Sequence, residues 1–192
     1  MAVVGVLALQ GSFNEHIAAL KRLGVKGVEI RKPEQLQSVS SLIIPGGEST
    51  TMAKLAEYHN LFPALREFVE MGKPVWGTCA GLIFLANKAT GQKTGGQKLV
   101  GGLDCTVHRN FFGSQENAEE GGKVIVAVRQ GNILGTAFHP ELTADTRWHS
   151  YFIKMSNANA GEEASSSSLV PAQVDIDITT IQQPRIDLPI FQ

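Results

Sequence analysis

A possible nucleophile lies in the middle of Gly77-Thr78-Cys79-Ala80-Gly81. Glycines two residues before and two after a nucleophile are typical of a sharp strand-to-helix turn, whose central side chain is exposed on a strained backbone. Residues 73–76 predict a short apolar strand before the turn, and residues 82–86 a buried helix after it. Cys79 would then begin that helix, where the macrodipole and free N–H groups favour a thiolate. A lone cysteine is usually a small packed residue, but this context favours a nucleophile.

A nucleophilic thiol needs a base, and His139-Pro140-Glu141 supplies the best candidate, at the end of the apolar run 133–138. A histidine that closes a strand can point toward the mouth of the turn. A carboxylate two residues later can hold the far ring nitrogen in the required tautomer. The chain order Cys, His, Glu differs from the order nucleophile, acid, His of α/β-hydrolases.

The other histidines fit a catalytic role less well. His16, His59 and His149 fall in helix-like segments and are expected to be surface or packing residues. His108 is less clear, because it adjoins Arg109.

A glycine loop supplies a third element of the predicted site. The apolar strand 42–44 runs into Pro45-Gly46-Gly47-Glu48-Ser49-Thr50, where a helix is expected to start. N–H groups at such a glycine turn can face a developing oxyanion, and the N–H of Ala80 would be the second donor. Taken alone, the same residues also fit a plain strand-to-helix loop with a capped helix.

Apolar strands alternate with helical patterns, which predicts an α/β fold with a mainly parallel sheet flanked by helices. Ser12 and Glu15 form a capping-box pattern at the start of a helix. Gly131-Asn132 joins two apolar runs, which predicts antiparallel strands beside the parallel core. Residues 148–155 predict a closing helix. Sites in open sheets gather at the carboxyl ends of strands, where the nucleophile, its base and the glycine loop would meet.

The composition indicates one globular domain, expected at residues 1–155. A chain of 192 residues can bury one sizeable core, and a net charge of −1 gives no electrostatic case for binding nucleic acid or an anionic membrane. The apolar run 2–9 is too short to span a bilayer and suits a buried first strand. With Cys79 placed as reactive and Cys105 in a strand-like segment, no disulfide is expected and a reducing, cytoplasmic compartment fits. Residues 156–192, rich in Ser and punctuated by Pro, predict a mostly disordered tail.

Five motifs within residues 1 to about 155 resemble the class I, triad-type glutamine amidotransferases, and more finely the glutaminase subunits of pyridoxal 5′-phosphate synthase, the Pdx2/SNO family. The motifs are Gly5-Val6-Leu7-Ala8-Leu9-Gln10-Gly11, Pro45-Gly46-Gly47-Glu48-Ser49-Thr50-Thr51-Met52, Gly77-Thr78-Cys79-Ala80-Gly81-Leu82, Arg109-Asn110 before Phe112-Gly113, and Phe138-His139-Pro140-Glu141-Leu142-Thr143. The resemblance implies a flavodoxin-like sheet with a nucleophile elbow.

The resemblance also implies an activity, which is hydrolysis of L-glutamine to glutamate and ammonia through a thioester on Cys79. His139 would shuttle the proton, and Glu141 would orient the ring of His139. The substrate-binding positions carried over from the family are Gly47, Glu48, Ser49 and Arg109. Ammonia would pass to a separate synthase subunit in a hetero-oligomer, which docks on the face that bears Gln10. No cofactor or metal is expected on this chain.

One departure from the family's pattern bears on activity. The family has several tens of residues after its Asn-x-Phe-Gly stretch, including a strand that contributes to glutamine binding, whereas here a short polar joint at about 115–123 replaces them. An alternative is therefore a shortened, catalytically weak or inactive form of this protein with an interaction or regulatory role. A cysteine-elbow protein of the DJ-1/PfpI kind is a third possibility, disfavoured by His-Pro-Glu and Pro-Gly-Gly-Glu-Ser.

Overall fold

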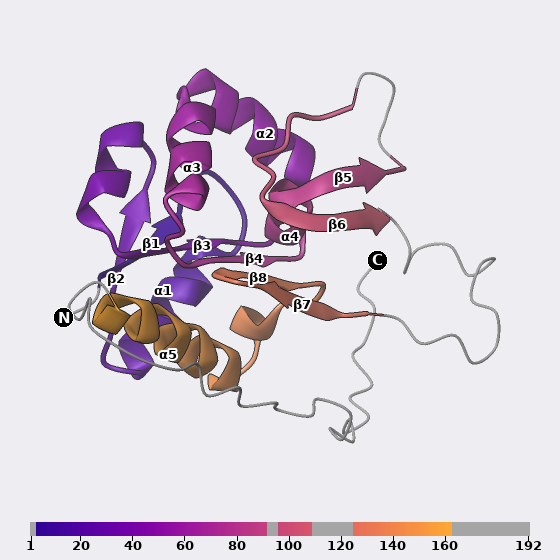
Figure 1. Cartoon of the computed structure of the whole chain (residues 1–192). Coiled ribbons are helices and arrows are strands. Elements are labelled where there is room, and N and C mark those ends of the chain that lie inside the picture. The colour runs from indigo at the N-terminus through magenta and orange to yellow at the C-terminus, as the bar shows by residue number, and fades with distance from the viewer. Residues whose placement is uncertain (1–2, 92–95, 109–124, 163–192) are drawn as a thin grey trace, which may run out of the picture.

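The computed structural model describes residues 3–91, 96–108 and 125–162, and its centre is a six-stranded sheet (Figure 1). The first five strands of the order β2-β1-β3-β4-β8-β7 are parallel, and β7 runs antiparallel to β8. A separate parallel pair joins β5 to β6. The strands are β1 (Val3–Leu7), β2 (Lys26–Ile30), β3 (Ser41–Ile44), β4 (Val75–Thr78), β5 (Ala86–Thr90), β6 (Leu103–His108), β7 (Ala127–Gln130) and β8 (Ile133–Thr136).

Helices cover both faces of the sheet, with α1 and α5 on one face and α2 and α3 on the other (Figure 1). Alternation within a strand explains this layering. On β3, Leu42 and Ile44 belong to the core under α2 and α3, whereas Ile43 belongs to the core under α1 and α5. The helices are α1 (Phe13–Arg22), α2 (Ser49–Tyr58), α3 (Leu61–Glu70), α4 (Ala80–Leu85) and α5 (Arg147–Glu162), with the 3₁₀ turns η1 (Pro33–Ser38) and η3 (Pro140–Leu142).

The α/β architecture and the β7–β8 hairpin are as predicted, but two local predictions need correction and one strand was missed. The capping box is wrong, because Ser12 makes no side-chain hydrogen bond to α1. Its hydroxyl donates instead to the carboxylate of Glu141. The strand β5 was not predicted. The closing helix also continues past Met155 to Glu162. Met155 and Ser156 are still buried, and the hydroxyl of Ser156 donates to the carbonyl of Phe152 one turn earlier.

The described ranges contain no helix that combines the length and apolar character needed to cross a membrane. Residues 163–192, which make up most of the predicted tail, lie outside the described part of the chain.

Candidate active site

Cys79 forms the predicted elbow between β4 and α4. Its backbone lies at φ 47° and ψ −102°, a conformation that costs a non-glycine residue about 1–3 kcal/mol. Its N–H donates to the carbonyl of Thr136 at 2.8 Å, which ties the elbow to β8. A Cβ on Gly77 would clash with the backbone carbonyl group of Gly81. Only glycine at position 77 therefore allows the strand and helix to approach so closely.

His139 and Glu141 lie together just after β8. The turn η3 brings Nδ1 of His139 to 2.9 Å from Oε1 of Glu141. The pKa of His139 is raised to about 10, first by its hydrogen bond with Cys79 and then by that with Glu141, against the opposing effect of burial. Since Nδ1 faces Glu141, Nε2 is the ring nitrogen available to the thiol. The structure thus brings together the three residues predicted to form the triad.

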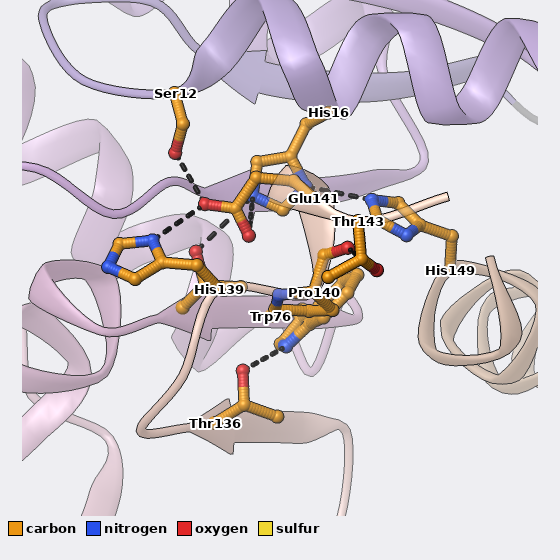
Figure 2. A network of polar contacts seen from close by, with 10 residues as sticks. Ser12, His16, Trp76, Thr136, His139, Pro140, Glu141, Thr143 and His149 are labelled. Atoms are coloured by element: carbon orange, nitrogen blue, oxygen red, sulfur yellow. Dashed lines mark hydrogen bonds and ion pairs between the residues drawn. The ribbon is translucent and has the colours of Figure 1, made fainter. Parts of the chain in front are cut away.

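Glu141 is buried, with 4% of its surface exposed, yet it is ionised at neutral pH. Burial acts to raise its pKa, but hydrogen bonds from His139 and Ser12 and the neighbouring His16 outweigh it, so the pKa is lower than usual. Ser12 donates to Oε1 at 2.5 Å, the same oxygen that His139 contacts. Figure 2 shows Ser12 and His139 on one side of the carboxylate and His16 on the other.

His16 and His149 are fully buried behind Glu141, so of the two roles expected for them, surface or packing, the surface role is wrong. Nδ1 of His16 lies 2.9 Å from Nε2 of His149, and Nε2 of His16 lies 3.5 Å from Oε2 of Glu141. The sequence did carry a signal for His16, because it precedes the buried Ala19 and Leu20 by three and four residues and so shares the apolar face of α1. His59 is exposed, as expected.

Burial is the main cause of unusual pKa values in this pair. It lowers the pKa of His16 to about 3, with Glu141 acting in the opposite direction and the other two histidines adding to the effect. It lowers the pKa of His149 to about 4. Both imidazoles are therefore uncharged at neutral pH, and the contact between His16 and Glu141 is one of a neutral ring with a carboxylate.

The glycine loop lies directly against the predicted base. A Cβ on Gly46 would clash with Cε1 of His139, so the loop approaches the ring with bare backbone. Gly47, at φ 148°, packs in the same way on the side chain of Gln10. Oε1 of Gln10 accepts from the backbone N–H of Glu48 at 2.9 Å. Gln10 therefore holds the loop that was predicted to bind substrate.

Glu48 and Ser49 have structural partners. Glu48 is the N-cap of α2, and its carboxylate accepts from the backbone N–H groups of Thr50 and Thr51 at 3.0 and 2.6 Å. A hydrogen bond from the Thr51 hydroxyl, together with these two, lowers the pKa of Glu48 to about 2. The hydroxyl of the buried Ser49 donates to Oε1 of Gln97 at 3.0 Å, a partner that no sequence pattern indicated.

The remaining predicted residues are placed less completely. Ala80 is buried in the first turn of α4, where N–H groups lack intrahelical partners. Arg109 lies outside the described residues. Cys105 lies half-buried on β6, as predicted, and burial followed by the nearby Asp104 raises the pKa of its thiol. Within the described residues, no three His, Cys, Asp or Glu side chains are arranged to hold a metal ion.

The site places a carboxylate, an imidazole and a thiol in sequence at the carboxyl ends of β4 and β8. The imidazole can give its proton to a leaving group, while the carboxylate keeps the ring in one orientation. This arrangement is suited to acyl transfer through a thioester.

Comparison with known sequences identifies relatives along most of the chain. The model of the SNO glutamine amidotransferase family matches residues 6–122 and 114–158. The chain is 57% identical over 253 residues to the probable pyridoxal 5′-phosphate synthase subunit PDX2 of Arabidopsis thaliana, covering 98% of this chain and 99% of that protein. It is 42% identical over 198 residues to the pyridoxal 5′-phosphate synthase subunit PdxT of Streptomyces avermitilis, covering 84% and 98% of the two chains.

Solved structures give a consistent result for the fold. A crystal structure of a glutamine amidotransferase has a TM-score of 0.70 and 40% identity, and the match covers 80% of this chain and 98% of that one. A putative GMP synthase component from Thermoplasma acidophilum, at a TM-score of 0.54 and 15% identity, has the same fold, and the match covers 86% and 98% of the two chains. The alignment with the Arabidopsis protein is longer than the 192 residues of this chain. That relative therefore contains positions with no counterpart here.

Proposed function

The chain belongs to the SNO glutamine amidotransferase family, and we propose that it hydrolyses L-glutamine to L-glutamate and ammonia, which it supplies to a synthase subunit for pyridoxal 5′-phosphate (vitamin B6) biosynthesis. The observation that carries this proposal is the strained Cys79 hydrogen-bonded to His139, whose other nitrogen lies 2.9 Å from the buried Glu141. The names of its relatives support the pathway.

In the proposed reaction the Cys79 thiolate attacks the side-chain amide carbon of glutamine. The oxygen of that amide gains negative charge and is stabilised by the N–H groups of Gly47 and Ala80. His139, whose raised pKa keeps its ring protonated, gives its proton to the departing ammonia. Water then attacks the thioester, His139 accepts a proton from it, and the thiolate is restored as glutamate leaves. Glu141 keeps the proton of Nδ1 in place throughout.

The proposed substrate site is the loop of Gly47, Glu48 and Ser49, with Arg109 on the carboxylate of glutamine. A guanidinium suits this carboxylate because it donates two parallel hydrogen bonds. The carboxylate of Glu48 is turned toward the start of α2. We propose that Glu48 acts by fixing the loop, so that the backbone of the loop meets the substrate in one conformation.

We also propose that the synthase subunit docks on the face bearing Gln10, because this residue is linked to the glycine loop. Gln10 contacts both Gly47 and the N–H of Glu48. A partner that displaces the Gln10 side chain would therefore also shift the proposed oxyanion donor, the N–H of Gly47. The isolated chain would then be a poor glutaminase. Two free cysteines fit the cytoplasm as the proposed location.

Ammonia release from glutamine, measured with and without a synthase subunit, tests the proposal. Cys79→Ala is expected to abolish turnover and the covalent adduct with a glutamine-analogue electrophile, and Cys105→Ala is the matched control that keeps both. Gln10→Ala is expected to reduce partner-stimulated activity more than stability. Labelling of Cys105 in preference to Cys79 would contradict the assignment of the nucleophile.

A second candidate is a shortened, weakly active or inactive interaction form of the same protein. The two family matches overlap at residues 114–122, which supports a missing stretch at the joint proposed for 115–123. Grafting the corresponding stretch of the Arabidopsis relative between Gln115 and Lys123 is expected to lower the glutamine KM and raise the Tm together. If the 192-residue chain already matches that relative in kcat/KM with synthase present, this second candidate is excluded.

A further inference from the structure

The two oxygens of the Glu141 carboxylate have different surroundings. Oε1 accepts from Ser12 and faces Nδ1 of His139. Oε2 is buried without a hydrogen bond of ordinary geometry, and it faces Nε2 of His16 at 3.5 Å. The carboxylate is therefore held on one side by Ser12 and His139, and on the other side it faces His16, which the proposed reaction does not use (Figure 2).

The proton positions on the two buried histidines follow from their neutrality. Each uncharged ring carries one N–H, and a carboxylate can only accept a hydrogen bond. A proton on Nε2 of His16 points at Glu141, whereas a lone pair there would face the negative oxygen across 3.5 Å. Nδ1 of His16 must then accept, and Nε2 of His149 donates to it at 2.9 Å. The two rings thus form one directed pair, whose last N–H points toward Oε2.

This pair of histidine rings is held by α1, α5 and β4. His16 lies on α1 and His149 on α5, and both pack edge-on against Trp76 of β4, at 5.5 and 4.9 Å between ring centroids. Nε2 of His16 also lies 3.3 Å from the hydroxyl of Thr78, the residue before Cys79. The same ring nitrogen therefore contacts the carboxylate of the triad and the strand that carries the nucleophile.

We propose that His16 and His149 are positioning residues, which present a fixed, uncharged N–H donor to Oε2 of Glu141 and so set the orientation of His139 toward Cys79. The role concerns the site of the proposed glutaminase and rests on that function for its effect on turnover. Its effect on the His139–Glu141 hydrogen bond exists without any substrate.

The test compares variants that keep or remove the donor. His16→Phe and His149→Phe keep an aromatic ring but cannot donate, whereas His16→Gln and His149→Gln place an amide N–H near the lost Nε2. With synthase present, the Phe variants are expected to lose about tenfold or more in kcat with KM within about twofold, because misplacing a reacting group by about 1 Å costs roughly a hundredfold. The Gln variants should recover most of that loss. His59→Phe, at an exposed position, is the control and should change neither constant.

A second readout needs no glutamine. The proton NMR signal of Nδ1–H on His139 should broaden or move upfield in the Phe variants and return in the Gln variants, and alkylation of Cys79 should slow in parallel. A purely structural role predicts lower stability with this signal and the alkylation rate unchanged, and that result overturns the proposal. If His16→Phe does not fold, His149→Phe decides the matter, because it leaves His16 in place and removes only its donor. A chain without glutaminase activity but with the expected NMR changes would refute the proposed function and not the positioning role.

Discussion

The hydroxyl of Ser12 donates to Oε1 of Glu141 at 2.5 Å, so the residue just before α1 holds the carboxylate that follows β8. Ser12→Ala leaves α1 without loss of a capping bond, because the serine side chain makes none. It removes a donor to a buried charge, which is worth about 1.5–3 kcal/mol. We expect the free energy of unfolding, measured with urea, to fall by up to that amount. The pKa of Glu141 should rise and kcat should fall. Ser12→Thr, which keeps the hydroxyl, should retain both properties, and equal kcat in the Ala and Thr variants would contradict the assignment.

Gly46→Ala should reduce activity far more than stability. The added methyl group would clash with Cε1 and Nδ1 of His139, so the ring must leave its present position beside Cys79 and Glu141. We expect a loss of about a hundredfold in kcat/KM. Gly24→Ala is the contrasting control, because Gly24 has φ +70° and nothing within 4 Å of the added atom. It should lower the Tm and leave kcat/KM intact. Similar kcat/KM in the two variants would contradict this prediction, because it would show that the loop moves to accommodate the methyl group and the His139 ring stays in place.

The high pKa of His139 should depend on Cys79 more than on Glu141. The hydrogen bond with Cys79 is the largest cause that raises this pKa to about 10, and the one with Glu141 is the next. In an NMR titration of the ring, Cys79→Ala should lower the pKa further than Glu141→Gln, and both should lie below the parent value. The reverse order would mean that Glu141, and not Cys79, is the main group that keeps the imidazole protonated.

Acid should destabilise the fold through His16 and His149. Their pKa values are near 6.5 in the unfolded chain but about 3 and about 4 in the folded one, so the unfolded chain binds more protons between these limits. Stability should therefore fall as the pH drops from 6.5 to about 4, by up to ~1.4 kcal/mol per pH unit for each histidine. His139, with its raised pKa, loses its contribution only as the pH rises from 6.5 toward 10, so it does not oppose this slope.

Urea unfolding at pH 7, 6 and 5 measures that slope. The double variant His16→Gln with His149→Gln is expected to be less stable at pH 7 but to show a flatter dependence of stability on pH. An unchanged slope in the double variant would place the acid-sensitive groups elsewhere.

The sequence predicted the features that depend on local chain chemistry. The elbow at Cys79 follows from the spacing of Gly77 and Gly81, whose missing side chains the close approach of β4 and α4 requires. The hairpin between β7 and β8 follows from Gly131 at φ +54°. The pairing of His139 with Glu141 follows from two residues of spacing within one tight turn.

The sequence did not predict contacts that close over long separations. The prediction of a capping box at Ser12 failed because a buried carboxylate from another part of the chain competes for the hydroxyl. His16 and His149 each look like an ordinary helical residue, and only the packing of α1 and α5 on the same face of the sheet brings them together (Figure 1). The position of His16 on the apolar face of α1 was the one local sign of this arrangement in the sequence.

The parallel pairing of β4 with β8 joins Gly77 to Gly135 and Thr78 to Thr136, and the N–H of Cys79 extends it by donating to Thr136. The nucleophile and its base thus meet through hydrogen bonds between two strands that are far apart in the sequence. Two separately produced fragments, one ending and one beginning between β4 and β8, would carry complementary strands with a single favourable register. This fold is therefore a natural candidate for a split protein whose activity reports the reunion of its halves.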